Sequence, residues 1–455
     1  MPSKLSHAVA AFSLTAMAVH SAHAVLYKVD PGPYDLSNGY FAVWYQDTHG
    51  RVLDLCLSKT VSSRVPGTPN APSYMCSLLP APGIFDASQP LAFPHNFPDE
   101  AFWFTADATL ADAARGVEMD YLVALEAAFN SGLPLDNDQV SFARIRIRAD
   151  LQEPGIYTVT HPYGTELFEV TAEDIGDDGD RAINMTRDLG IGAPQIYTGA
   201  LTGDIGPFLR SVNGPYVETN PETMAQETFI GDPNLEEAVT GSPFGTNYVR
   251  LQGPNGLDVR TELFAISGRL SSTVSGDTPL IPQRATYSRE NGDTGVVAQQ
   301  DVFVLAPPPP GLASYVDTAG VTVGMTESTA TGNWYGQSSA NPELPASVSL
   351  SADNELAIPG SVPGTATAVL TDLVQIHRAE YSLSSAQLSI EASSSDQITP
   401  PVLTATFDYG ALIGALNGEG STQQLNTGVS PIPPAHVTVT SANGGSDTEE
   451  VVILP

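Results

Sequence analysis

Arg284-Ala285-Thr286-Tyr287 and Arg378-Ala379-Glu380-Tyr381 are two stretches of one pattern, Arg-Ala-x-Tyr, in the second half of the chain. Each opens a run of short segments in which apolar and polar residues alternate. Each run ends in a second shared pattern, which reads Pro345-Ala346-Ser347-Val348 in the first copy and Pro434-Ala435-His436-Val437 in the second. A repeated unit of roughly 80 to 90 residues, built from short alternating segments, predicts two β-sandwich modules in tandem.

Turn-forming residues are frequent throughout the chain. The 455 residues include 40 glycines and 37 prolines, which interrupt the sequence too often for long helices. Thr, Val, Ile, Tyr and Phe recur in segments of about five to nine residues, as expected for strands. We therefore predict an all-β fold, with an elaborated N-terminal β-sandwich domain followed by two tandem immunoglobulin-like β-sandwich modules.

Segments rich in Gly, Pro, Ser or Thr mark the expected domain boundaries, near 275–282 and 359–367. The region before the first boundary is long enough for one elaborated domain or two entwined subdomains, and the sequence does not separate these alternatives. The expected organisation is an N-terminal domain at 25–275, a first module at 283–358 and a second module at 368–455.

Two local patterns support a β-sandwich in the N-terminal domain. Residues 140–149 alternate between apolar and charged side chains, which is the pattern of a strand with one buried face. Leu151, a turn containing Gly155, and Tyr157 two residues later form the pattern of a tyrosine corner. In that motif the phenol hydroxyl bonds to the backbone a few residues upstream, so we expect a structural role for Tyr157.

The second copy of the repeat carries a family resemblance. Its Arg378-Ala379-Glu380-Tyr381 stretch, its Leu388-Ser389-Ile390-Glu391-Ala392 strand pattern and its Ser441-Ala442-Asn443-Gly444-Gly445 turn resemble the C-terminal immunoglobulin-like modules of secreted bacterial multidomain proteins. The resemblance implies a fold and a location outside the cytoplasm, and it brings no catalytic residues. The first copy has Ser351-Ala352-Asp353-Asn354 in place of the glycine turn, so its last strand is not predicted.

Residues 1–24 have the pattern of a secretory signal peptide. Lys4 supplies the positive charge, 8–19 an apolar run, and Ala22-His23-Ala24 a cleavage site. The apolar run is too short to span a bilayer, and no later stretch of about 18 apolar residues follows it. We expect a secreted protein, extracellular or periplasmic, without membrane insertion.

Acidic residues dominate the charge balance. The chain has 51 Asp and Glu against 18 Lys and Arg, a formal net charge of −33 at pH 7. Such a surface stays hydrated, attracts divalent cations, and repels nucleic acids and anionic lipids within a Debye length of about 10 Å. Nucleic acid is therefore excluded as an expected partner.

Cys56 and Cys76 are the two cysteines of the chain. An even pair in an exported protein predicts a disulfide. Closing the loop between them would contribute about 3 kcal/mol to stability by restricting the unfolded chain.

Four aspartates form the strongest ligand-like cluster: Asp174, Asp177, Asp178 and Asp180. Calcium prefers hard oxygen ligands and tolerates irregular loops, so the cluster could supply half of a coordination shell. The spacing does not match an EF-hand loop. A solvated acidic turn is the alternative reading, and calcium is the one cofactor that the sequence suggests.

Aromatic residues offer a second candidate site. Trp334-Tyr335 lies among Gly and Asn residues, and we predict a carbohydrate contact there because exposed aromatic rings stack on sugar rings. Core packing is the alternative, and it is the reading that we prefer for Trp44 and Trp103.

Three arginines, Arg144, Arg146 and Arg148, share one face of the alternating strand. They could bind an anion. A solvated sheet face whose arginines pair with carboxylates of neighbouring strands is the alternative that we favour.

Sequence patterns for catalysis are weak. His95 lies near Asp99 and Glu100, but no nucleophile motif accompanies it, so we interpret it as an exposed loop histidine. The favoured function is therefore non-enzymatic: a structural, adhesive or ligand-presenting extracellular protein, stiffened by calcium if the aspartate cluster binds it. The expected partner is a polysaccharide or a cell-surface component. The alternative is an extracellular polysaccharide-active hydrolase with its site in the N-terminal domain.

Overall fold

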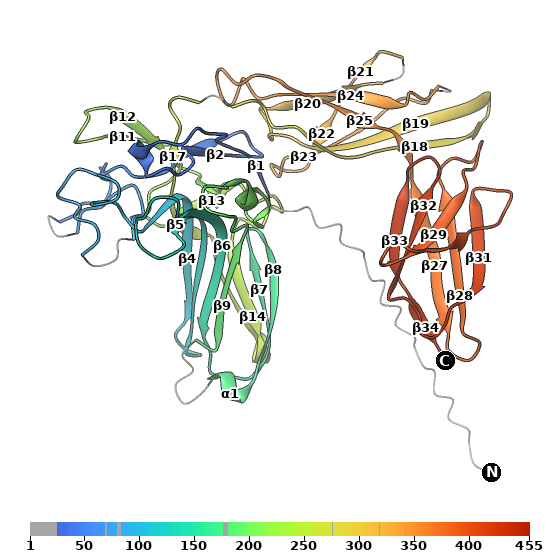
Figure 1. Cartoon of the computed structure of the whole chain (residues 1–455), viewed down its shortest axis with the longest axis horizontal. Helices are drawn as coiled ribbons and strands as arrows, with labels where there is room; N and C mark the ends of the chain where they lie inside the picture. Colours follow the sequence, from blue (N-terminus) through green and yellow to red (C-terminus); the bar gives the residue numbers. More distant parts are fainter. Residues whose placement is uncertain are drawn as a thin grey trace, which may run out of the picture. The chain divides into compact units, whose positions relative to one another are not determined.

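A computed structural model describes residues 25–68, 71–79, 83–175, 181–274, 276–317, 319–341 and 343–455. The predicted signal peptide, 1–24, lies outside these residues. The fold is all-β, as predicted (Figure 1). The helices of the described residues are short: α1 (Ala172–Ile175) and the 3-10 helices η1 (Leu36–Asn38), η2 (Thr198–Thr202) and η3 (Pro254–Gly256).

The chain forms two compact units, described separately below. One comprises 25–373 together with Ser395–Thr399, and the other comprises Val374–Ser394 and Pro400–Pro455. The larger unit contains the N-terminal domain and the first module.

Three sheets build the N-terminal domain (Figure 1). The six-stranded sheet has the order β1 (Leu26–Val29), β2 (Trp44–Asp47), β3 (Val52–Asp54), β17 (Arg269–Leu270), β12 (Gln226–Phe229), β11 (Tyr216–Thr219). The seven-stranded sheet has the order β10 (Arg210–Ser211), β13 (Glu237–Thr240), β16 (Leu263–Ser267), β4 (Glu100–Asp112), β5 (Val117–Phe129), β6 (Gln139–Asp150), β9 (Ile183–Leu189). The four-stranded sheet has the order β15 (Leu257–Thr261), β14 (Val249–Gly253), β7 (Gly155–His161), β8 (Gly164–Val170).

One hydrophobic core holds these three sheets together. It runs from Leu26 to Ile266 and takes side chains from all of them. Strand β6 shows why the sequence folds this way: Ile145 and Ile147 are buried in the core, as their alternation predicts. The three sheets therefore share one continuous core.

The tyrosine corner at the start of β7 is confirmed. The Tyr157 hydroxyl donates a hydrogen bond to the carbonyl oxygen of Glu153, at 2.6 Å. The ring packs against Gly253 of the neighbouring strand β14, where even a Cβ atom would lie 2.5 Å from the ring. The corner therefore fixes the turn before β7 and its contact with β14.

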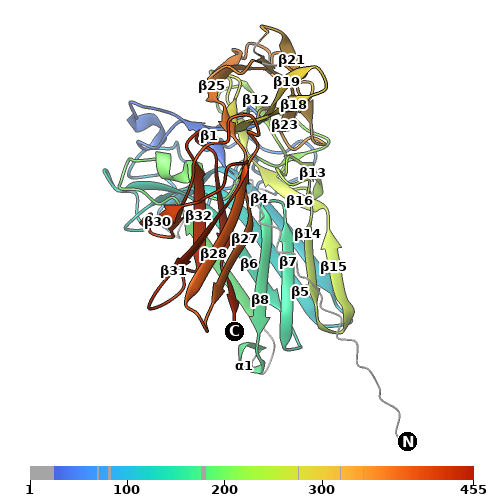
Figure 2. The same cartoon turned by 90° about the vertical axis from the view of Figure 1, so that its right-hand side faces the viewer.

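Each module is a sandwich of two sheets. In the first module the sheets have the orders β22 (Thr326–Glu327), β23 (Asn333–Gln337), β19 (Gly295–Leu305), β18 (Ile281–Gly292), β26 (Thr371–Asp372) and β21 (Thr322–Gly324), β20 (Leu312–Val316), β24 (Ser347–Asp353), β25 (Gly364–Val369). In the second they have the orders β31 (Thr422–Gly428), β28 (Gln387–Ser394), β27 (Val374–Ser382), β34 (Val452–Leu454) and β30 (Leu412–Ala415), β29 (Leu403–Phe407), β32 (His436–Ser441), β33 (Ser446–Glu450). Figure 2 shows β27, β28 and β31 of the second module side by side.

The two modules share one topology, strand for strand, apart from the additional edge strand β22. In each, the first strand pairs with the second antiparallel and with the last in parallel. Each first strand has a register shift directly before its Arg-Ala-x-Tyr stretch, at Arg284 and at Arg378. Both tyrosines, Tyr287 and Tyr381, then point into the core of their own module. The repeated sequence pattern thus marks a bulge followed by a buried anchor.

The first module extends beyond its expected end at 358. Strand β25 pairs with β24, and β26 pairs with β18, so its sheets continue to Asp372. The expected boundary near 359–367 falls inside the module because β25 is an edge strand of small residues, which resembles a linker in sequence.

A segment between β24 and β25 replaces the tight glycine turn of the second module. It contacts the N-terminal domain, where the Asn354 side chain donates to the carbonyl oxygen of His49 at 3.3 Å. The Gly50 Cα lies close enough to Ile358 that an added Cβ would meet its side chain at 3.3 Å. The first copy departs from the repeat at the point where it contacts this domain.

Candidate functional site

The predicted calcium site lies mostly outside the described residues. The residues outside the described ranges include Asp177, Asp178 and Asp180. Asp174 is described and exposed, and its carboxylate accepts hydrogen bonds from the backbone N–H and the hydroxyl of Thr171, at 2.8 and 2.7 Å. These bonds lower the pKa of Asp174. Within the described ranges, no three His, Cys, Asp or Glu side chains are grouped in a way that could hold a metal ion.

On the arginine face of β6, Arg144 is paired with carboxylates. The Arg144 guanidinium contacts Asp188 at 2.7 Å and Glu126 at 2.9 Å. Arg148 lies opposite Asp120 in the pairing of β5 with β6. The favoured reading, a sheet face whose arginines pair with carboxylates of neighbouring strands, is therefore confirmed for Arg144 and stays a prediction for Arg146 and Arg148.

Glu126, on the same face, is a carboxyl group with a strongly perturbed pKa. Burial raises its pKa to about 8, against the opposing charge of Arg144. A buried acid with a raised pKa is a feature of catalytic sites. However, its side chain is 1% exposed, and a general acid must reach its substrate. Glu126 is therefore a buried partner of Arg144 and does not supply an accessible acid for the hydrolase alternative.

The disulfide is present between Cys56 and Cys76, with Cα atoms 5.3 Å apart. Both cysteines are buried with Met75 and Phe229 in a small cluster separate from the main core. The described residues of the disulfide loop (56–76) form isolated β-bridges and no strand, so the disulfide and side-chain contacts position the loop.

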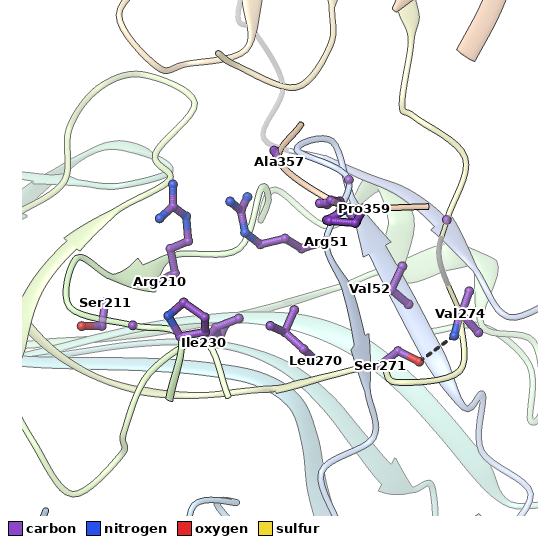
Figure 3. Close-up of a pocket in the computed structure, with 15 residues that line it drawn as sticks. Arg51, Val52, Arg210, Ser211, Ile230, Leu270, Ser271, Val274, Ala357 and Pro359 are labelled. Carbon is purple, nitrogen blue, oxygen red and sulfur yellow. Dashed lines mark hydrogen bonds between the residues drawn. The ribbon is translucent and has the colours of Figure 1, made fainter. Parts of the chain in front are cut away.

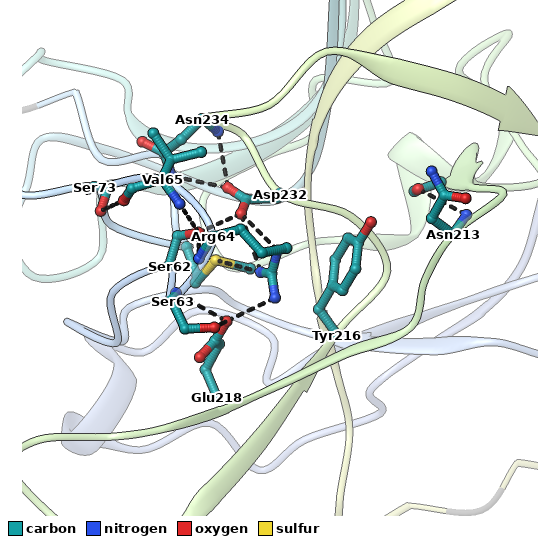
Figure 4. Close-up of polar contacts among 12 residues, drawn as sticks. Ser62, Ser63, Arg64, Val65, Ser73, Asn213, Tyr216, Glu218, Asp232 and Asn234 are labelled. Atoms are coloured by element: carbon teal, nitrogen blue, oxygen red, sulfur yellow. Dashed lines mark hydrogen bonds and ion pairs between the residues drawn. The ribbon is translucent and has the colours of Figure 1, made fainter. Parts of the chain in front are cut away.

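Arg64 connects the disulfide loop to strand β11 and to the segment between β12 and β13 (Figure 4). Its guanidinium lies 2.8 Å from Glu218 and 3.0 Å from Asp232, and it stacks 3.7 Å above the Tyr216 ring. Burial would raise the pKa of Asp232, but hydrogen bonds from Ser62 and other donors outweigh burial and lower it. Two buried carboxylates around one arginine form a structural ion cluster, in which the carboxylates are bonded by Arg64 and by neighbouring serine hydroxyls.

His95 and His161 occupy different environments. His95 is exposed, as expected. His161 is buried, and its Nδ1 atom lies 3.1 Å from the Tyr121 hydroxyl and 3.3 Å from the backbone nitrogen of Tyr163. Its role is local hydrogen bonding.

The carbohydrate contact predicted at Trp334 is wrong. Its side chain is 5% exposed and belongs to the core of the first module. The indole N–H donates to the carbonyl oxygens of Ala306 and Pro307, both at 3.2 Å. A ring enclosed in this way has no face for a sugar.

Tyr335, the other half of the prediction, lies on the opposite face of β23 and is 38% exposed. Its ring packs on Phe303 of β19 with centroids 4.8 Å apart. The Arg284 guanidinium of β18 lies 4.2 Å from the Phe303 centroid on the other side. These three residues are paired directly across three adjacent strands, and we call them the aromatic row.

Polar atoms flank the aromatic row. The Tyr335 hydroxyl donates to Asp301 at 2.7 Å, and the Gln337 amide donates to the same oxygen at 3.0 Å. The row therefore combines flat apolar rings with a carboxylate, an amide and a guanidinium. The sequence prediction missed Arg284 and Phe303, which the Arg-Ala-x-Tyr repeat and strand alternation could have placed beside Tyr335.

The second module carries a different row at the same place. Arg378, Glu391 and Gln424 are paired across its first, second and fifth strands, as Arg284, Phe303 and Tyr335 are in the first. Gln424 donates to Glu391 at 2.6 Å, and Arg378 lies 3.8 Å from the same carboxylate. Because one topology accepts both rows, the fold does not require aromatic residues at these positions.

Comparisons with known proteins identify no family. No family model and no curated protein matches the chain. Among solved structures, the teleost fish polymeric Ig receptor ectodomain matches at 7% identity and TM-score 0.20, over 38% of this chain and 98% of that one. SGBP-B of the Bacteroides ovatus mixed-linkage glucan utilization locus, in complex with a mixed-linkage heptasaccharide, matches at 10% identity and TM-score 0.19. The match covers 46% of this chain and 52% of that one. A 1.5-MDa bacterial ice-binding adhesin matches at 10% identity and TM-score 0.15, over 70% of this chain and 91% of that one.

The described residues contain no helix of the length and apolar character needed to cross a membrane.

Proposed function

We propose that this protein is a secreted, non-enzymatic ligand-presenting or adhesive protein, and that the aromatic row of its first module binds a polysaccharide or another cell-surface glycan. Export is supported by the signal pattern at 1–24. It is also supported by the Cys56–Cys76 disulfide, because such bonds persist in oxidising compartments. The proposal includes calcium as a stiffening ion at Asp174, Asp177, Asp178 and Asp180.

The single observation that carries the proposal is the contrast between the two rows. Tyr335 is 38% exposed and Phe303 is half-buried, and both lie outside the core of the first module, whereas the second module has the polar residues Glu391 and Gln424 at the corresponding positions. The Tyr335 and Phe303 rings, tilted by 37° with centroids 4.8 Å apart, offer apolar surface to the C–H face of a sugar ring. Asp301 and Gln337 beside them can exchange hydrogen bonds with sugar hydroxyls.

A glycan array probed with the purified mature protein tests this function. We expect binding to at least one glycan class, and a loss of about tenfold, or ~1.4 kcal/mol, in Tyr335→Ala. Tyr409→Ala is the matched control, because Tyr409 is 79% exposed and its ring also packs on a phenylalanine, Phe407, in the second module. The control variant should bind like wild type.

Three results would overturn the proposal. One is an array without any bound glycan. Another is an equal loss of glycan binding in the Tyr335 and Tyr409 variants, which would mean that the aromatic row is not the binding site. The third is release of new reducing ends from a bound glycan, which would show hydrolysis and favour an enzyme.

A further inference from the structure

A cavity of about 300 Å³ lies where the N-terminal domain meets the segment after β24 (Figure 3). Its walls are mainly aliphatic, with Ile230, Leu270, Val274 and Ile358 among them. Two arginines, Arg51 and Arg210, also line it. Figure 3 shows their side chains extending toward each other.

Among the described residues, Arg51 and Arg210 have no carboxylate partner, unlike most arginines of this protein. Most of the other arginines lie within 4.0 Å of a carboxylate. Among the described residues, no carboxylate lies within that distance of Arg51 or Arg210. The Nε atom of Arg210 is buried, and no described group hydrogen-bonds to it. In a chain of net charge −33, two neighbouring guanidinium groups without carboxylates need a separate explanation.

The surrounding groups leave the cavity with an excess positive charge. Asp47 is the nearby carboxylate, but it accepts backbone hydrogen bonds from His49, Arg51 and Phe208 at 2.8 to 3.0 Å. Its acceptor oxygens thus hold the turn and do not contact the guanidinium groups. Burial and the adjacent Arg51 lower the pKa of Arg210 to about 10, so it stays protonated at neutral pH. Burial lowers the pKa of His49 to about 3, so it is neutral there.

We propose that this cavity binds a small organic monoanion, in which a carboxylate contacts Arg51 and Arg210 and an apolar body fills the aliphatic walls. Guanidinium groups match the planar geometry of a carboxylate. A partly buried excess charge is unfavourable alone and is offset when an anion arrives. The volume is at the lower end of the range for small-molecule sites, and such sites often lie between domains.

The segment after β24 supplies one of the apolar walls of this site. Ile358 belongs to the residues that stand in place of the glycine turn of the second module. The first copy therefore has additional residues at this turn, and they close one side of the cavity. The cavity shares no residue with the aromatic row, and it would bind a different class of ligand. This proposal is therefore independent of the proposed glycan function.

Calorimetric titration of the full mature protein with acetate, hexanoate, benzoate and decanoate tests the site. We expect at least one longer carboxylate to bind more tightly than acetate, and benzamide to bind at least tenfold more weakly than benzoate. Sulfate serves as a probe with charge and no apolar body. If no carboxylate binds, if benzamide equals benzoate, or if sulfate and acetate bind as tightly as the longer acids, the proposal is overturned.

Variants locate the binding. Arg210→Gln and Arg51→Gln should each weaken carboxylate binding at least tenfold, whereas Arg181→Gln, at an exposed arginine away from the cavity, should not. Val274→Phe should fill the cavity and abolish binding of the longer acids while both arginines remain. This last variant decides the case if an arginine variant fails to fold, which circular dichroism and a melting curve would reveal. Unchanged binding in Val274→Phe would overturn the assignment to this cavity.

Discussion

Acid should destabilise the larger unit through His49, which is buried at the junction with the first module. Its ring Nε2 atom lies 3.4 Å from the carbonyl oxygen of Thr331. Burial, reinforced by the positive charges of Arg51 and Arg210, lowers its pKa from 6.5 to about 3. The folded state therefore resists protonation of this histidine, and the unfolded chain does not.

The sign and size of the effect follow from this difference. Because the folded pKa is below the unfolded pKa, the stability contributed by neutral His49 is complete above about pH 6.5 and is lost as pH falls toward 3. Each pH unit in that window costs about 1.4 kcal/mol. Between pH 7.5 and 4.5 the loss assigned to His49 is roughly 2 to 3 kcal/mol.

Urea unfolding followed by tryptophan fluorescence measures this loss. All three tryptophans, Trp44, Trp103 and Trp334, lie in the larger unit, so the signal reports that unit. Wild type and His49→Gln are compared at pH 7.5 and 4.5. Carboxylates and the buried His161 titrate in both proteins, so their contributions cancel in the difference.

The expected result is a wild type that loses roughly 2 to 3 kcal/mol more than His49→Gln on acidification. His95→Gln, at an exposed loop histidine, should behave like wild type. Equal losses in wild type and His49→Gln, within about 0.5 kcal/mol, would refute the reasoning, because they would mean that the His49 ring accepts a proton in the folded state.

Three further variants test the contacts of the N-terminal domain by the same unfolding measurement. Tyr157→Phe removes the corner hydrogen bond and should cost about 1 kcal/mol; an unchanged midpoint would deny the corner a stabilising role. Replacing both Cys56 and Cys76 by Ser should cost about 3 kcal/mol, and a reducing agent should then destabilise wild type and leave the variant unaffected. Arg64→Ala removes the cation that faces two buried carboxylates and should lower the free energy of unfolding by about 3 to 5 kcal/mol. Arg115→Ala, at an exposed ion pair, should lower it by less than about 1 kcal/mol. Similar losses in the two variants would contradict a stabilising role for the buried cluster.

The fold was largely predictable because its signals are local or repeated. The alternation in 140–149, the corner at Tyr157 and the tandem Arg-Ala-x-Tyr stretches each depend on residues a few positions apart. Such patterns follow directly from strand geometry and turn chemistry. The end of the first module was missed because β25 is an edge strand with few large apolar residues. Its composition does not identify it as a strand, whereas its pairing with β24 does.

The candidate sites were harder to predict because they depend on which face a side chain takes and on distant partners. Trp334 and Tyr335 are neighbours in one strand, so they must point to opposite sides, and only one could meet a ligand. The prediction assigned both to the surface. Arg51 and Arg210 come from a turn of the six-stranded sheet and from an edge strand of the seven-stranded sheet, and nothing in their local sequence connects them.

The two copies of the module separate what the fold needs from what it tolerates. Positions that point inward keep their character, as in Tyr287 and Tyr381, because each must fill the core of the same topology. The outer row and the turn after the sixth shared strand are not constrained in this way, and both differ between the copies. In the first copy the outer row is aromatic and the turn is replaced by a segment that closes a cavity with two arginines. Selection for stability alone gives no reason for either change, so both proposed binding sites lie where the repeat has diverged.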